Sequence, residues 1–439
     1  MAAVLAGYAL FGKGFAYLGH YPVFVGEVCL LVGCIQFLRS TGWRLIPRCT
    51  CSLAIVAFMT WGVVRTAPFL PVHGLDALRD AAVWGYGAFA LLVAAALRGA
   101  GAVRPAVALY AAAAPVYLAI VPAIYLLFRV AEPALPVWPG TDVTIIFHKA
   151  GDIGVHVGAA AAALVVGLDR RVGCGERSSD RVLEWMAWLG FGATVVLLAA
   201  IKRAGFLAVV TALAIACSLR PGWRILRPVG LIALVAGFMA VSGLTVNFGE
   251  RQRPVSIEMF GQSMKSLVGE TDVAHLDGPA NWRIEWWRTI IGYTILGDRF
   301  WTGKGYGMSL AVADGFLDAE FPTNRLPHNG HMTILARSGV PGLALWLLVN
   351  ASFVYAVMRR LSTVRKAGEA AEVAVGAWLL AAWAAFIVNM TFDVYLEGPQ
   401  GGIWFWSLIG FGIAWSAPPV ARGGSDSDPA TRGDRGRLC

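Results

Sequence analysis

Residues 105–128 read PAVALYAAAAPVYLAIVPAIYLLF and contain no charged side chain. A helix rises about 1.5 Å per residue, so this stretch alone is long enough to cross about 30 Å of hydrocarbon. The rest of the 439-residue chain has the same character, because 57% of its residues are hydrophobic and only 14% are charged. Soluble domains usually carry about 25% charged residues. The sequence therefore predicts a polytopic, all-α membrane protein.

Apolar runs of similar length precede and follow this stretch. Together they predict about twelve transmembrane spans. The first of these is interrupted by Lys13. The predicted spans are residues 3–18, 21–38, 50–66, 81–97, 105–128, 153–168, 183–201, 204–219, 226–246, 330–357, 372–391 and 401–416.

The distribution of basic residues predicts the orientation, because Lys and Arg in short connections are retained in the cytoplasm. Alternate connections are rich in them, and the others hold few. We therefore expect both termini to be cytoplasmic and residues 247–327 to be external. The net charge of +9 follows from this asymmetry, and no nucleic acid is expected as a partner. The basic residues assigned to the cytoplasmic side are Arg39, Arg44, Arg48, Arg98, Arg104, Arg170, Arg171, Arg177, Arg181, Arg220, Arg224, Arg227, Arg359, Arg360, Arg365 and Lys366.

Four regions follow from this topology. Residues 1–246 form the first part of a transmembrane bundle, and residues 330–416 form its C-terminal part. Residues 247–329 form an external loop or lid domain that contains amphipathic helices, and residues 417–439 form a disordered cytoplasmic tail. The second half does not repeat the first, which argues against a carrier built from related halves. A large external insertion is typical of an enzyme that acts on lipid-linked material.

The external segment ends in two histidines, in residues 326–331 (LPHNGH), immediately before an apolar run. Ionisable groups beside the lipid phase usually mark a place of chemistry or transport, and imidazole changes charge near neutral pH. A capping or packing role is the alternative for His328 and His331. The pair lacks a clear third ligand, so we expect no metal and no cofactor.

Several cations accompany these histidines. Lys202 and Arg203 separate two apolar runs, and Arg283 and Arg288 lie on a helix expected over residues 281–296, with Asn281 as its cap. Each of these cations either binds an anionic headgroup or extends to the lipid surface. The segment 303–307 (GKGYG), which contains Lys304, is either a plain turn or a phosphate-binding loop. Glu397 is a candidate partner for one of the arginines.

The sequence gives less specific predictions for the other polar residues. Glu27, His156 and Asn389 are expected to make hydrogen bonds between helices. Four residues of another external connection are expected to line an acceptor entrance: Asp142, His148, Lys149 and Asp152.

These residues resemble, in order, the O-antigen ligase and polymerase superfamily of bacterial membrane glycosyltransferases. Residues 201–207 (IKRAGFL) are similar to its Ser-Arg-x-x-x-Leu helix start, although Lys202 stands where Ser is usual. Residues 281–287 (NWRIEWW) resemble its Arg-x-x-x-Trp segment, which GKGYG follows. Residues 327–335 (PHNGHMTIL) and 339–343 (GVPGL) resemble its His-Asn and Gly-x-x-Gly element, and residues 393–399 (DVYLEGP) also look familiar. The resemblance covers roughly residues 195–410.

The resemblance implies transfer of a glycan from an undecaprenyl-pyrophosphate carrier to an acceptor hydroxyl, such as that of lipid A core, on the external face of the bacterial inner membrane. It also implies that His328 is the base. Guanidinium groups suit a pyrophosphate leaving group, which favours Arg203 and Arg283 as the other catalytic residues. The expected substrate-binding residues are His331, Arg288, Lys304, Lys202 and Glu397.

Three alternatives stay open. A polysaccharide polymerase of the same superfamily would use the same donor with a growing chain as acceptor. A polysaccharide or lipid transporter would use the arginines as an anion pathway. A non-catalytic relative is the third, because Lys202 departs from the family pattern.

Overall fold

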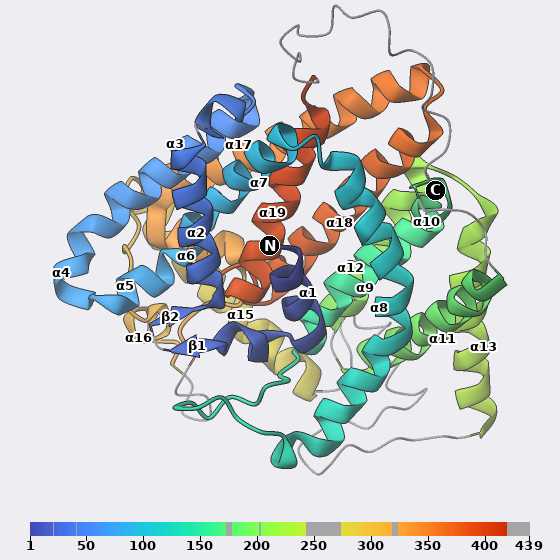
Figure 1. The fold of residues 1–439 in the computed structure, drawn as a ribbon. Coiled ribbons are helices and arrows are strands. Elements are labelled where there is room, and N and C mark those ends of the chain that lie inside the picture. The colour runs from blue at the N-terminus through green and yellow to red at the C-terminus, as the bar shows by residue number, and fades with distance from the viewer. Residues whose placement is uncertain are drawn as a thin grey trace, which may run out of the picture.

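The computed structural model describes residues 1–20, 22–40, 42–172, 178–201, 203–242, 274–317 and 324–418. Within these ranges, side chains are not described at 171–172, 178–180, 200, 203, 235–236, 239 and 274–280. The described chain is mainly helical, and its one small ribbon pairs β1 (Gly19–His20) with β2 (Val23–Phe24) in antiparallel register. Figure 1 shows the central position of α18 and α19, with α8, α11 and α13 on one side and α3 to α6 on the other.

The helices and their bounds, in chain order, are α1 (Ala2–Phe11), η1 (Lys13–Tyr17), α2 (Val25–Arg39), η2 (Gly42–Leu45), α3 (Thr50–Thr66), η3 (Ala67–Phe69), α4 (Leu70–His73), α5 (Leu75–Asp80), α6 (Ala82–Gly85), α7 (Gly87–Gly99), α8 (Val103–Ala131), η4 (Glu132–Ala134), α9 (Ala150–Val165), α10 (Leu168–Val172), α11 (Ser178–Ile201), α12 (Arg203–Leu219), η5 (Trp223–Ile225), α13 (Leu226–Ser242), α15 (Ala274–Thr294), α16 (Leu310–Asp314), α17 (Gly330–Lys366), α18 (Ala370–Phe392) and α19 (Pro399–Ser416).

Six helical segments of the described chain are long and apolar enough to cross a membrane. These support an all-α, multi-pass membrane protein, while the full count of about twelve spans stays a prediction. Shorter apolar helices cover Ala2–Phe11, Ala150–Val165 and Ala204–Leu219. The six segments are Thr50–His73, Ala82–Gly99, Val103–Ala134, Arg181–Ala199, Gly330–Lys366 and Ala370–Phe392.

The first predicted span, residues 3–18, is not one helix. α1 ends at Phe11, because Gly12 takes a left-handed φ of 62° and Lys13 donates its backbone N–H to the Phe147 carbonyl (2.9 Å). The short 3-10 helix η1 follows. Ten residues of α1 reach only about 15 Å, so α1 is too short to cross the hydrocarbon alone.

Helices α9, α12 and α18 pack against one another and form the inner part of the bundle. Small residues allow α9 and α12 to approach closely, since a Cβ added to Gly154 would lie 2.4 Å from the Gly205 carbonyl oxygen. A Cβ at Gly151 would lie 2.9 Å from Oδ1 of Asn389 on α18. The starts of α9 and α12 and the end of α18 therefore meet at one end of the bundle.

Helix α17 is broken one-quarter of the way along its length. Gly339 has φ 68° and ψ −171°, so the helical hydrogen-bond pattern is interrupted there. The glycine-rich segment fills the break: the backbone N–H groups of Lys304 and Gly305 donate to the carbonyls of Ala336 (2.6 Å) and Arg337 (3.0 Å). The predicted span 330–357 is thus two helical parts in one element.

The described segment that contains α15 and α16 packs on α17 through a small apolar cluster. Trp286 and Ile290 of α15 are buried in it, together with residues of α16 and the second turn of α17. α15 begins at Ala274, so Asn281 lies inside the helix and is not its cap. The helix continues through Pro279, where only one backbone donor is missing. Ile284 of α15 and Ile295, which directly follows the helix, are exposed.

Candidate active site

Hydrogen bonds at Pro327 and Asn329 fix the backbone on both sides of His328. The indole N–H of Trp287 donates to the Pro327 carbonyl oxygen (2.9 Å), and the Asn329 side chain caps α17 by accepting from the Met332 N–H (3.1 Å). Among the described non-glycine residues, only His328 has a positive φ, at 53°. L-residues rarely adopt this conformation, and such strain is concentrated at functional sites.

The imidazole of His328 faces a buried carboxylate. Its Nδ1 atom lies 3.5 Å from Oδ1 of Asp393, and the side chains are 27% and 3% exposed. Asp393 is the first residue after α18, where the Val394 N–H donates to the same Oδ1 (2.8 Å). Asp393 was not among the sequence-predicted site residues, although it begins the segment 393–399 that resembles the family. The structure identifies it as the partner of His328.

Arg283 reaches the same turn from α15. Its Nη1 donates to the carbonyl oxygen of Phe392 (3.3 Å), the residue before Asp393. The ring of Trp282, one position earlier, has its centroid 6.3 Å from that of His328. The sequence-predicted base and one sequence-predicted cation are therefore brought together, although 45 positions separate them in the chain.

Of the second predicted cation site, only the backbone of Arg203 is described. Arg203 begins α12, and a Cβ at Gly205 would lie 2.9 Å from the Ala150 carbonyl oxygen at the start of α9. The next residue of α9, Gly151, lies beside Asp393, whose Oδ2 would be 3.4 Å from an added Cβ. The start of α12 is thus close to the turn that contains Asp393. Lys202 and the side chain of Arg203 lie outside the described residues.

Two predicted substrate-binding residues have partners inside the protein. Nδ1 of His331 accepts a hydrogen bond from the indole N–H of Trp346 (3.1 Å), so this imidazole faces the bundle and not His328. The ammonium of Lys304 forms an ion pair with Asp314, donates to the Ala313 carbonyl oxygen (2.9 Å) and lies 4.5 Å from the Tyr293 ring centroid. Arg288 lies on the exposed side of α15.

The amides of the glycine-rich segment are also occupied. The Lys304 and Gly305 N–H groups bond α17, and the Gly307 N–H donates to Oδ2 of Asp80 (2.9 Å). These three donors are committed to the protein, so the segment behaves as a structural turn. Of the two readings of GKGYG, the plain turn fits this geometry.

Glu397 and Asn389 supply further polar groups near the site. Burial raises the pKa of the Glu397 carboxyl, while the nearby Thr333 hydroxyl and the Arg337 and Lys149 cations oppose this shift. The Thr333 hydroxyl donates its hydrogen bond to the Asn329 carbonyl oxygen (3.1 Å) and not to Glu397. Neither carboxylate oxygen of Glu397 has a hydrogen-bond partner among the described residues. The amide of Asn389, which is fully buried, also has none within the described chain.

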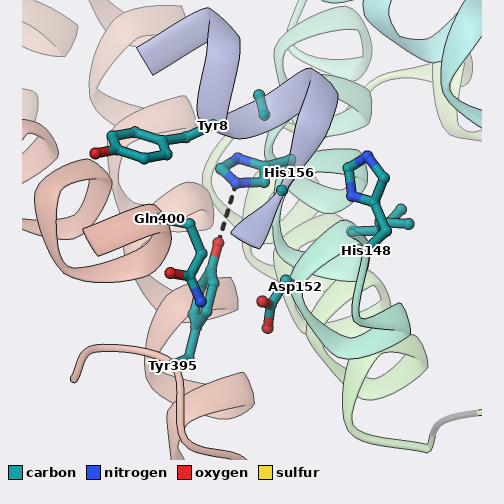
Figure 2. Close-up of a pocket in the computed structure, with 9 residues that line it drawn as sticks. Tyr8, His148, Asp152, His156, Tyr395 and Gln400 are labelled. Atoms are coloured by element: carbon teal, nitrogen blue, oxygen red, sulfur yellow. Dashed lines mark hydrogen bonds between the residues drawn. The ribbon is translucent and has the colours of Figure 1, made fainter. Parts of the chain in front are cut away.

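A small cavity of about 10 Å³ lies next to this region, between α1, α9 and α19, and is the size of one water molecule. Figure 2 shows His156 of α9 and Tyr395 joined by a hydrogen bond, which is 3.0 Å long. Tyr395 lies in the connection between α18 and α19, so the partner of His156 is a connecting residue and not the second helix that was expected. His148 bonds the Leu10 carbonyl oxygen (2.7 Å), and burial lowers its pKa to about 4. Both His148 and Asp152 are buried, so they line this cavity and not an open entrance.

A buried ion pair that the sequence did not reveal connects α5 to α17 beside the glycine-rich segment. Nη2 of Arg337 lies 2.8 Å from Oδ2 of Asp80, with the side chains 1% and 6% exposed. Arg337 also donates to the carbonyl oxygens of Gly305 (3.1 Å) and Met308 (3.3 Å). Tyr306 completes the contact through a hydroxyl hydrogen bond to Ser338 (2.7 Å). This network holds the loop before α16 against the break in α17.

The site thus combines an imidazole–carboxylate pair, a guanidinium from α15 and the start of α12. In the part of the chain that is described, no three His, Cys, Asp or Glu side chains are grouped to hold a metal ion.

Comparison with known proteins points to one family. No curated protein matches the chain. The family model for O-antigen ligase matches residues 186–347, which include the Arg203, Arg283 and His328 positions. The match confirms the resemblance carried by residues 201–207, 281–287 and 327–343, and it identifies the chain as a membrane protein with a domain of the O-antigen ligase and polymerase superfamily.

Proposed function

We propose that this protein transfers a glycan from an undecaprenyl-pyrophosphate carrier to an acceptor hydroxyl of lipid A core or a similar molecule, on the external face of the bacterial inner membrane. The observation that supports this most is the convergence of His328 and Arg283 on the turn at Phe392 and Asp393. A general base and an anion-binding cation at one place are the two groups that this reaction requires.

His328 acts as the general base. Asp393 faces Nδ1, which favours the tautomer with a proton on that nitrogen and leaves the Nε2 lone pair to accept the acceptor proton. The separation of 3.5 Å is longer than a hydrogen bond, and catalytic hydrogen bonds often shorten when substrate binds. The acceptor oxygen then bonds to the anomeric carbon as the bond to the pyrophosphate oxygen breaks.

The arginines stabilise the leaving group. The pyrophosphate departs with the bonding electron pair, so its negative charge grows during the step, and guanidinium groups bind such oxygens through paired N–H donors. Arg283 supplies one cation from α15, and Arg203 at the start of α12 supplies the second. Arg288, exposed on α15, is available to the carrier, whereas Lys304 is already paired with Asp314.

A deletion strain that carries plasmid-encoded variants tests the proposal. We expect Arg283→Ala and His328→Ala to abolish the glycosylated product, while Arg359→Ala, an exposed arginine on the far half of α17, leaves it unchanged. Full product formation with both site residues substituted would exclude the enzyme. Export failure with normal glycan linkage would instead support a transporter.

The glycan species that accumulates in the deletion strain distinguishes a ligase from a polymerase. A missing ligase leaves long glycan chains attached to the carrier lipid, because chain extension still proceeds. A missing polymerase leaves single repeat units on the carrier or on the acceptor. The ligase proposal expects the long lipid-linked chains.

A further inference from the structure

A groove of about 650 Å³ opens between α8, α18 and α19. It lies at the opposite end of the bundle from the candidate active site, because α18 begins at Ala370 on the groove and ends at Phe392 beside Asp393. A helix of this length separates its two ends by about 35 Å, which is close to the thickness of the hydrocarbon layer. The connections at the groove end are rich in arginine and are predicted to be cytoplasmic.

The groove is amphipathic. Apolar residues such as Val107 of α8 and Val375 of α18 form its walls, while Arg104, Glu369 and Glu372 lie at its polar end. Nε of Arg104 lies 3.7 Å from Oε1 of Glu372, but its side chain is 85% exposed. This guanidinium therefore keeps most of its N–H donors available.

The two carboxylates differ in their present contacts. Oε2 of Glu372 accepts the indole N–H of Trp415 (2.7 Å), which fixes that side chain. Glu369 is exposed and its carboxylate has no ion pair or side-chain hydrogen bond among the described residues. The residues that line the groove thus include one cation, Arg104, and two anions, and the guanidinium of Arg220 donates to the Ala370 carbonyl oxygen (3.2 Å) at the same end.

We infer that this groove binds one membrane phospholipid whose headgroup carries both a phosphate and a primary ammonium. The phosphate pairs with Arg104, because guanidinium binds phosphate oxygens through several N–H donors. The ammonium pairs with Glu369, and acyl chains lie along the apolar walls. Both α8 and α18 begin at the groove, so the first-turn N–H groups that have no helical partner lie at the phosphate end.

Charge and hydrogen bonding select this class of headgroup. An anionic headgroup without an amine would leave the Glu369 carboxylate without a cationic partner and would place a negative charge beside it. A quaternary ammonium has no N–H to donate and is usually bound by several aromatic faces, whereas Trp415 is the single aromatic residue that lines the groove among the described residues. A primary ammonium has three N–H donors for the carboxylates.

Native mass spectrometry of the purified full-length protein tests this inference. The probes are phosphatidylethanolamine, phosphatidylcholine and phosphatidylglycerol with identical acyl chains, added in equal amounts. We expect the ethanolamine lipid to bind about tenfold more tightly than the other two. We expect Arg104→Gln with Glu369→Gln to remove this preference.

Two residues outside the groove, the half-buried Glu132 and the exposed Arg359, provide matched controls. Glu132→Gln and Arg359→Gln make the same charge changes elsewhere and should leave lipid binding unchanged. Equal or tighter binding of the glycerol or choline lipid would overturn the inference. An ethanolamine preference that survives in the double variant would overturn it as well, and a thermal unfolding curve confirms that the double variant is folded.

Discussion

The Nδ1 atom of His328 lies 3.5 Å from Oδ1 of Asp393, although 65 positions separate the two residues in the chain. One precedes α17 and the other follows α18, so the packing of these two helices sets their separation. In the proposed reaction, Asp393 positions the base and does not touch the reacting atoms.

Replacing Asp393 by Asn is expected to lower kcat about 100-fold with little change in the KM for the lipid-linked donor, because an amide no longer favours the required imidazole tautomer. Arg283→Gln should instead raise that KM as well as lower kcat, because it removes a contact to the donor. Steady-state transfer kinetics separate the two outcomes. A donor KM that rises equally in both variants would show that Asp393 is part of the donor site.

The Arg337–Asp80 pair is expected to dominate the stability of the contact between the glycine-rich segment and α17. Arg337→Gln removes the buried cation beside Asp80 and leaves that carboxylate only the more exposed Arg325 and Arg79, so it should lower the free energy of unfolding by up to about 3–5 kcal/mol. Arg325→Gln is the control, since this side chain is 27% exposed and 3.5 Å from Asp80, and should cost about 1 kcal/mol or less. Denaturant unfolding in detergent measures both. Similar losses would mean that burial of Arg337 does not set the strength of its pair.

Gly303 is expected to tolerate no side chain. Its φ is 58°, and an added Cβ would lie 2.5 Å from the Ala336 carbonyl oxygen, so Gly303→Ala combines backbone strain with a clash. We expect it to destabilise the protein by more than about 1 kcal/mol. Gly292→Ala on the exposed side of α15 meets nothing within 4 Å and should stabilise it by about 0.5–1 kcal/mol. The two substitutions should change the free energy of unfolding in opposite directions. A Gly303→Ala variant with an unchanged free energy of unfolding would contradict the close packing of this loop on α17.

Stability should fall in mildly acidic solution because of His148. Burial lowers its pKa to about 4, whereas the unfolded chain has the ordinary value of about 6.5. As the pH falls below about 6.5, His148 is protonated in the unfolded chain before it is protonated in the folded protein. The stabilisation present above pH 6.5 is therefore lost as the pH falls towards 4, by up to about 1.4 kcal/mol per pH unit.

His148→Gln keeps an N–H for the Leu10 carbonyl oxygen but does not titrate. Unfolding free energies at pH 7 and pH 5 should differ less in this variant than in the unsubstituted protein. An unchanged difference would show that other groups cause the acid sensitivity.

Local motifs in the sequence indicated those candidate site residues that stand out within their own segment. His328 and Arg283 stand out because polar groups beside apolar helices are rare, and the structure brings them to one turn. Asp393 and the Arg337–Asp80 pair escaped prediction because no spacing rule connects residues on helices far apart in the chain. Only the packing of α5, α17 and α18 makes them neighbours.

The fold shows the same limit. Hydropathy predicted an all-α membrane protein, but the break at Gly339 was hidden inside an apolar run, since the Gly303–Gly305 backbone that fills it comes from outside that run. Likewise, α1 ends at Phe11 because the backbone of Lys13 pairs with Phe147, a contact that hydropathy does not report. Both the break in α17 and the early end of α1 are caused by contacts with residues distant in the sequence.

The central claim is that one site, made by His328 and Arg283, transfers the glycan. The most direct measurement is a transfer assay with purified protein in lipid nanodiscs, an undecaprenyl-pyrophosphate-linked glycan and lipid A core, which follows glycosylated acceptor and released carrier pyrophosphate together. We predict that both products form in equal amounts, and that His328→Ala and Arg283→Ala each lower the rate at least about 100-fold. Transfer at an undiminished rate by the folded double variant would contradict the account.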